Sequence, residues 1–140
     1  MQELAILLRA CQFYAHNAHN LASGETFFED HEYLGELYAA YESAYDGVIE
    51  RIIGLGDVPD LIDLTAKATE RLKAMGESAP QEVVFAALMK AEREICAACD
   101  AASEGESSGT INFLQGLADA SEMRQYKLRQ RTKEEPEEKE

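Results

Sequence analysis

Apolar residues recur at helical spacing through most of the chain, and polar or glycine-rich stretches divide it into five predicted helices. The first is expected to end near Ser23, and the second to run from about Glu25 to Leu55. The apolar stripes of these two helices are Leu4, Leu7, Leu8, Cys11, Ala15 and Ala18, then Leu34, Leu37, Tyr41, Tyr45, Val48 and Ile52. No segment alternates with the two-residue period of a strand, so the pattern predicts an all-α chain.

The later helices follow breaks that contain proline and glycine. We expect a short helix over about 60–75, a long one over about 81–102, and a last one over about 110–131 that Thr110 caps. The short helix lies in a long connection between the second and third long helices, which a bundle with tight loops would not need. The predicted architecture is a four-helix bundle with a crossover over residues 1–132, followed by a disordered acidic tail over 133–140.

Composition and charge narrow the possible functions. The 140 residues, 46 % of them hydrophobic, suffice for one domain with a core. Thirteen Lys and Arg against 27 Asp and Glu give a formal net charge of −14, which opposes sequence-independent binding of nucleic acid and suits a cationic partner. No apolar run reaches the roughly 18–20 residues of a membrane span, and the start lacks the basic region of a signal peptide. We therefore expect a cytoplasmic protein with no membrane partner.

The candidate chemistry lies in the first half of the chain. The three histidines, His16, His19 and His31, fall in one 16-residue window around the first predicted turn between helices. Asp46 and Glu50 lie four residues apart on the second predicted helix, so their side chains share one face. Imidazole and carboxylate together suit Fe, Mn or Zn. Each group alone is more often structural or solvated, and the clustering is what favours a metal site.

Helix geometry limits how these groups can meet. His31 and Asp46 are fifteen residues apart on one helix, which separates them by about 22 Å. Ligands of one metal ion lie only a few ångströms apart, so His31 and Asp46 of one chain cannot share an ion. If the second helix packs antiparallel against its twin across a two-fold axis, His19 and His31 of one chain meet Asp46 and Glu50 of the other. Such an interface would hold two identical sites.

This pattern resembles a known family. The run His19-x4-Gly24-x2-Phe27-Phe28-x2-His31, followed by Asp46 and Glu50 at these spacings, is similar to the ferroxidase signature of the Dps-like miniferritins, within the ferritin-like superfamily. The similarity is clear from about Leu8 to Gly56. It implies a ferritin-like four-helix bundle with a short helix in its long connection. It also implies a dimer-built homo-oligomeric shell of about twelve subunits.

The resemblance also implies an activity. Iron(II) would be oxidised by hydrogen peroxide at dimer-interface sites and stored as ferric mineral inside the shell, which protects against oxidative damage. By position, His19 and His31 would come from one subunit and Asp46 and Glu50 from its two-fold partner, with no organic cofactor. Asp46 and Glu50 would hold the tighter iron with His19, and His31 would help to place a second metal or a water.

The chain departs from the family pattern at three points. Gly35 stands where the family usually has Asp, so we expect the second iron to be weakly held or absent, and Gly35→Asp to restore it. Asn20 stands where a Trp commonly follows the first histidine. The Lys-rich terminal arm with which some members bind DNA is not present in the sequence, so DNA binding is not expected.

Two alternative functions remain open: a DNA-compacting shell protein, and a helical metal-binding or interaction module without ferroxidase activity. The basic run from Arg124 to Lys133 is expected to be a solvated helix end rather than a DNA contact. Acidic residues near the last predicted turn are candidates for lining a pore that admits iron; they are Asp100, Glu104, Glu106 and Asp119. Cys96 and Cys99 have the spacing of a redox motif, but mid-helix they are expected, like Cys11, to be core thiols.

Overall fold

The computed structural model describes residues 1–132, which form five α-helices and no strand in that range. They are α1 (Gln2–Leu21), α2 (Phe27–Gly54), α3 (Leu61–Met75), α4 (Gln81–Ser103) and α5 (Ser108–Thr132). The predicted all-α class is confirmed, and the helix boundaries lie within about two residues of those expected. The acidic tail predicted over 133–140 lies outside the described residues.

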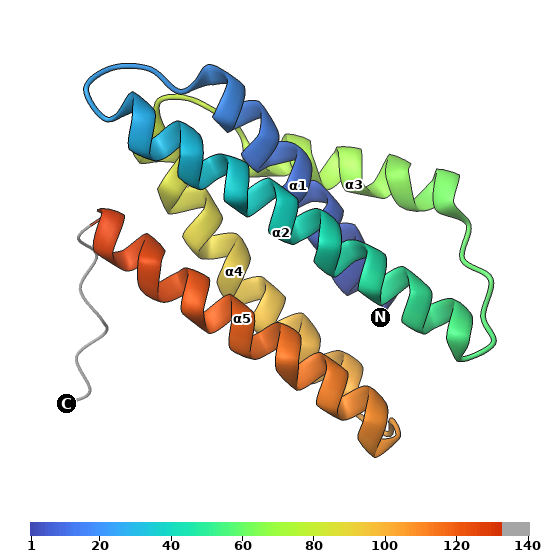
Figure 1. Ribbon diagram of the computed structural model, residues 1–140. Coiled ribbons are helices and arrows are strands. Elements are labelled where there is room, and N and C mark those ends of the chain that lie inside the picture. The colour runs from blue at the N-terminus through green and yellow to red at the C-terminus, as the bar shows by residue number, and fades with distance from the viewer. Residues whose placement is uncertain (133–140) are drawn as a thin grey trace.

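The helices form two antiparallel pairs, α1 with α2 and α4 with α5 (Figure 1). Between the pairs, α3 returns along the outside of α1, so α4 runs in the same direction as α2 (Figure 1). This is the crossover that the long connection predicted. The side chain of Asp60 caps α3 by accepting hydrogen bonds from the backbone N–H groups of Ile62 and Asp63.

The start of α5 differs from the prediction. The helix begins at Ser108 rather than at Thr110, and the hydroxyl of Ser107 accepts a hydrogen bond from the Thr110 backbone N–H at 3.3 Å. Thr110 is therefore a buried residue of the first turn and not the cap. Serine and threonine are both good caps, so the sequence alone does not decide between them.

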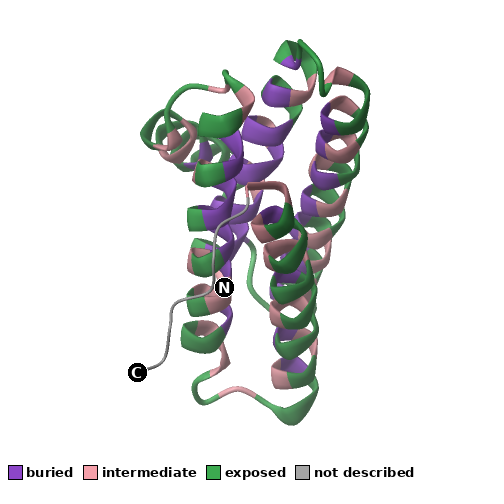
Figure 2. Cartoon of the chain, turned by 90° about the vertical axis from the view of Figure 1, so that its left-hand side faces the viewer, coloured by how far each residue is buried: buried purple, intermediate pink, exposed green. Residues whose placement is uncertain are grey.

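The core lies where the apolar stripes of the two pairs face each other, as the buried inner surfaces in Figure 2 show. Large side chains from four helices are completely buried there, and they include Tyr14, Tyr41, Phe85, Leu114 and Leu128. Burying a side chain of this size contributes about 1.5–3 kcal/mol. Within residues 1–132, no helix is long and apolar enough to cross a membrane.

A buried polar cluster joins the two helix pairs inside this core. Glu92 of α4 is fully buried, and it accepts hydrogen bonds from the Tyr41 hydroxyl at 2.6 Å and the Ser121 hydroxyl at 2.8 Å. Arg124 of α5 forms an ion pair with the same carboxylate. Burial raises the pKa of Tyr41 well above its ordinary value, and the negative charge of Glu92 raises it further.

A second polar cluster holds the beginning of α2. Asp30 is only 2 % exposed, and its carboxylate accepts hydrogen bonds from Arg131, Gln81 and Thr26. Burial works to raise the pKa of Asp30, but these hydrogen bonds and the Arg131 charge outweigh it and lower the pKa to about 2. The cluster ties the first turn of α2 to the start of α4 and the end of α5, and so it fixes the backbone next to His31.

Candidate metal-binding site

The antiparallel α1–α2 pair brings His19 and His31 together at the turn between the helices. His19 lies in the last turn of α1, and His31 lies in the second turn of α2. The connection includes Gly24 at φ +90°, a backbone conformation that side-chain-bearing residues rarely adopt. The two imidazole rings stack with their centroids 3.7 Å apart and their planes inclined by 19°.

The two histidines also anchor each other through the backbone. His19 Nδ1 lies 2.6 Å from the carbonyl oxygen of His31, and His31 Nδ1 lies 2.9 Å from the carbonyl oxygen of His19. A carbonyl oxygen only accepts hydrogen bonds, so in each ring Nδ1 is the donor and, in the neutral imidazole, Nε2 carries the lone pair. Neither Nε2 has a hydrogen-bond partner within residues 1–132.

Further aromatic rings hold this histidine pair from both sides. Phe27 stacks on His31 with ring centroids 4.9 Å apart, and Tyr38 meets the His19 ring edge-on at 5.3 Å. His16 in turn stacks on Tyr38 at 4.0 Å. The sequence reasoning did not single out Tyr38, although its seven-residue spacing from His31 places both on one helix face.

Gly35 leaves the space that the His19 ring uses. A Cβ atom at position 35 would lie 3.3 Å from both Cε1 and Nδ1 of His19, which is closer than ordinary van der Waals contact. The His19 ring can therefore occupy its present position because residue 35 has no side chain.

The two carboxylates lie elsewhere on the same uninterrupted helix. Asp46 and Glu50 are both exposed, and neither has a hydrogen-bond or ion-pair partner within residues 1–132. In that part of the chain no three His, Cys, Asp or Glu side chains are grouped so that they could hold a metal. One subunit thus presents two separate groups of possible ligands, a histidine pair and a carboxylate pair. This agrees with the separation of about 22 Å between His31 and Asp46 that the rise of the helix predicts.

Two of the three cysteines, Cys11 and Cys99, are core thiols, whereas Cys96 lies outside the core. Cys11 and Cys99 are buried, and Cys96 is partly buried, with Gln125 Nε2 donating to its Sγ at 3.3 Å. Burial raises the pKa of the Cys11 thiol strongly, and it raises the pKa of Cys99 to about 11. Because the thiolate is the reactive form, these two thiols are unreactive at neutral pH.

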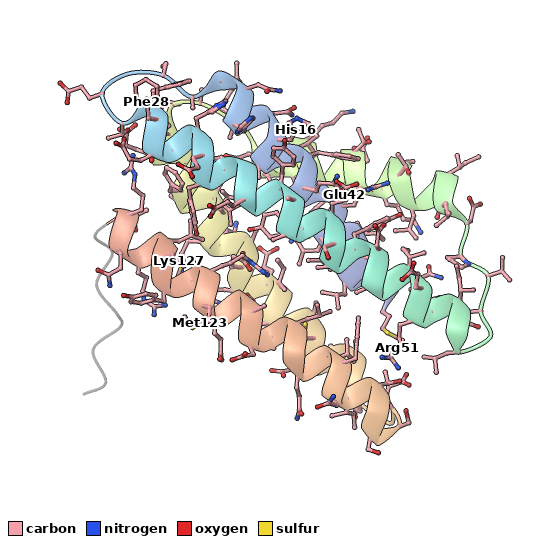
Figure 3. All side chains as sticks on the ribbon, in the orientation of Figure 1. His16, Phe28, Glu42, Arg51, Met123 and Lys127 are labelled. Atoms are coloured by element: carbon pink, nitrogen blue, oxygen red, sulfur yellow. The ribbon has the colours of Figure 1, made fainter. Side chains whose placement is uncertain are left out.

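The expectation of a solvated basic helix end is wrong for two of its arginines. Arg124 is only 15 % exposed in its ion pair with Glu92, and Arg131 is paired with buried Asp30. Lys127 does project from α5 into solvent (Figure 3). Lys133 lies outside the described residues. The acidic residues around the turn between α4 and α5 are mainly exposed, and their role in a pore stays a prediction.

The fold and this geometry agree with the comparison to known families. A model of the ferritin-like domain matches residues 2–135 of the 140-residue chain. The chain belongs to the ferritin-like family. No curated protein sequence matches it. Ferritin-like domains generally bind iron, serve iron storage or oxidation, and typically assemble into homo-oligomeric shells. Imidazole nitrogen and carboxylate oxygen are donors that suit iron(II), so the histidine pair and the carboxylate pair both have the chemistry of possible iron ligands.

Proposed function

We propose that this chain is a Dps-like miniferritin that oxidises iron(II) with hydrogen peroxide and stores the ferric product in a hollow cytoplasmic shell of about twelve subunits. The observation that carries the proposal is the reciprocal anchoring of His19 and His31. Each Nδ1 is held by the other residue's carbonyl oxygen, which leaves both Nε2 atoms for a metal ion. A histidine that ligates a metal characteristically donates its other N–H to a carbonyl or carboxylate in this way.

The site becomes complete when two α2 helices pack antiparallel across a two-fold axis. Asp46 and Glu50 of the partner subunit then bind the first iron(II) together with His19, and His31 helps to place the second iron or a water. Two iron(II) ions give up one electron each, and the peroxide O–O bond breaks to form two waters after two protons are taken up. Removing iron(II) and peroxide together protects the cell from oxidative damage.

The exposed face of α2 supports this packing. In the required register the two-fold axis passes near the exposed Ala39, whose small side chain allows two helices to approach closely. The same register sets Phe28 of each subunit opposite Ile53 of the other. These side chains are 79 % and 52 % exposed in the single chain, and burying them is a favourable consequence of dimer formation.

Mixing two inactive variants tests the shared site. We expect His31→Ala and Asp46→Ala each to abolish ferroxidase activity, and we expect activity to return when the two are unfolded and reassembled together. Each mixed dimer contains one site with both residues intact. Ferrous oxidation by peroxide is the readout, and native assembly of each variant is the control. No recovery in correctly assembled mixtures would refute a shared site.

The alternative of a DNA-compacting shell is disfavoured by the charges. The net charge is −14, and Arg124 and Arg131 are engaged by Glu92 and Asp30. Phosphate contacts lose affinity as salt competes, so we expect no shift of duplex DNA in a gel at about 150 mM salt. A metal-binding module without ferroxidase activity would bind iron(II) but fail to oxidise it with peroxide.

A further inference from the structure

A third histidine lies one helical turn before His19 and has no role in the proposed site. His16 is exposed on α1, and its ring lies 6.2 Å from that of His19, between centroids. Its ring is held flat against Tyr38, with an angle of 13° between the planes. It makes no hydrogen bond within residues 1–132, so its ring nitrogens are free to bind a ligand.

A third carboxylate, that of Glu42, lies on α2 one helical turn before Asp46, just as His16 lies one turn before His19 on α1. Asp46 in turn lies one turn before Glu50, so all three carboxylates fall within an arc of about 80° on the helix. Glu42 is exposed, and it has no hydrogen-bond or ion-pair partner in the described part of the chain. His16 and Glu42 both project from the α1–α2 pair (Figure 3).

The directions of the helices in the proposed dimer bring His16 of one subunit level with Glu42 of the partner subunit. In one subunit α1 runs antiparallel to α2 (Figure 1), and in the proposed dimer the partner's α2 also runs antiparallel to α2. The partner's α2 therefore runs parallel to α1. Stepping from His19 back to His16 moves about 4.5 Å along α1, and stepping from Asp46 to Glu42 moves about 6 Å in the same direction. A register that places Asp46 of the partner subunit at His19 thus places Glu42 of the partner subunit at His16.

We propose that His16 and Glu42 of the partner subunit bind a second iron(II) about 5 Å along the helices from the first. This inference rests on the proposed function and assigns the carboxylate that Gly35 cannot supply. One imidazole and one carboxylate leave most coordination positions to water, so this ion is held more weakly than the first. Metal ions that share bridging ligands lie about 3.5–4 Å apart, so the two irons occupy neighbouring, separate sites.

Cobalt(II) titration of the assembled protein tests the assignment without using activity. We expect wild type to bind about two Co²⁺ per chain, one tightly and one weakly. Glu42→Gln and His16→Phe should each remove the weak class and leave the tight one. The phenylalanine keeps a ring against Tyr38 while removing the ligand nitrogen. Glu36→Gln is the matched control, because Glu36 is exposed on α2 but turned about 120° from Glu42.

Anomalous scattering from crystals soaked in cobalt(II) locates the ions, and mixing the variants tests whether the weak site is shared. A dimer of one His16→Phe chain and one Glu42→Gln chain retains one intact site of two. Random reassembly of equal amounts makes about half of the dimers mixed, so about a quarter of the weak binding should return. If Co²⁺ occupies only the Asp46–His19 position in wild type, this inference is wrong and the proposed function stands. If Co²⁺ binds at neither position, both are wrong.

Discussion

His19 and His31 each place the Nδ1 nitrogen against the backbone carbonyl oxygen of the other, at 2.6 and 2.9 Å, while their rings stack 3.7 Å apart. Each residue therefore orients the ring of the other, and the two contacts hold the end of α1 against the beginning of α2. This mutual orientation fixes the two Nε2 atoms through contacts within the chain, so binding of iron at the proposed site would carry a lower ordering cost.

Gly35→Ala is expected to weaken metal binding. An added Cβ would lie 3.3 Å from the His19 ring and would force it to move by a few tenths of an ångström. Cobalt(II) affinity measured by calorimetry should fall several-fold, while Gly116→Ala, where a Cβ meets nothing within 4 Å, should leave it unchanged. Gly35→Asp has the same steric cost but also supplies a carboxylate ligand, so the cobalt(II) affinity of this variant should exceed that of Gly35→Ala. Unchanged affinity of Gly35→Ala would show that His19 does not depend on this space.

Arg124→Met should destabilise the protein strongly. It would leave the carboxylate of Glu92 buried without its cation, which typically costs about 3–5 kcal/mol of the free energy of unfolding. Tyr41→Phe removes one hydrogen bond to the same carboxylate and should cost about 1–2 kcal/mol. The control is Lys127→Met, an exposed position on the same helix with an expected effect within about 0.5 kcal/mol. Urea unfolding followed by circular dichroism, at one protein concentration, measures all three.

The Asp30–Arg131 pair should make stability depend on pH in the acid range. The pKa of Asp30 is about 2 in the folded chain against an ordinary value of 3.8. Its ionised form therefore stabilises the fold fully above about pH 5, and this contribution disappears as the pH falls through 4 towards 2. Asp30→Asn should be less stable than wild type at pH 7, and the difference should shrink towards zero near pH 2. Glu29→Gln, at an exposed neighbouring position, should show no such pH-dependent difference.

Phe28→Ser should impair assembly without destabilising the subunit. The side chain is 79 % exposed in the single chain, so its removal costs little folding energy but deletes two apolar contacts from each dimer. Light scattering of wild type should give a closed particle of about twelve subunits, and Phe28→Ser should give smaller species at micromolar concentration. Val83→Ser, at a 46 % exposed position of α4, is the comparison. A wild-type protein that stays monomeric would contradict both the shell and the shared site.

Much of the fold follows from local features of the sequence. The helical period of the apolar residues, the cap at Asp60 and the breaks around Gly54, Gly76 and Pro80 set the helices nearly where the structure has them. The separation of His31 from Asp46 also follows from the sequence, because an uninterrupted helix has a fixed rise per residue. These are properties of neighbouring residues, and they do not require knowledge of how the helices pack.

Contacts between distant segments were decided only by tertiary structure. The basic run at the end of the chain was expected to be solvated, yet Arg124 reaches Glu92 from 32 positions away and Arg131 reaches Asp30 from 101 positions away. The carbonyl anchors of His19 and His31 were likewise not predictable from residue types, because every residue carries a carbonyl oxygen. Which side chain meets which partner depends on how each helix is rotated and displaced against its neighbours. Packing of the whole core sets those two quantities, and no local pattern encodes them.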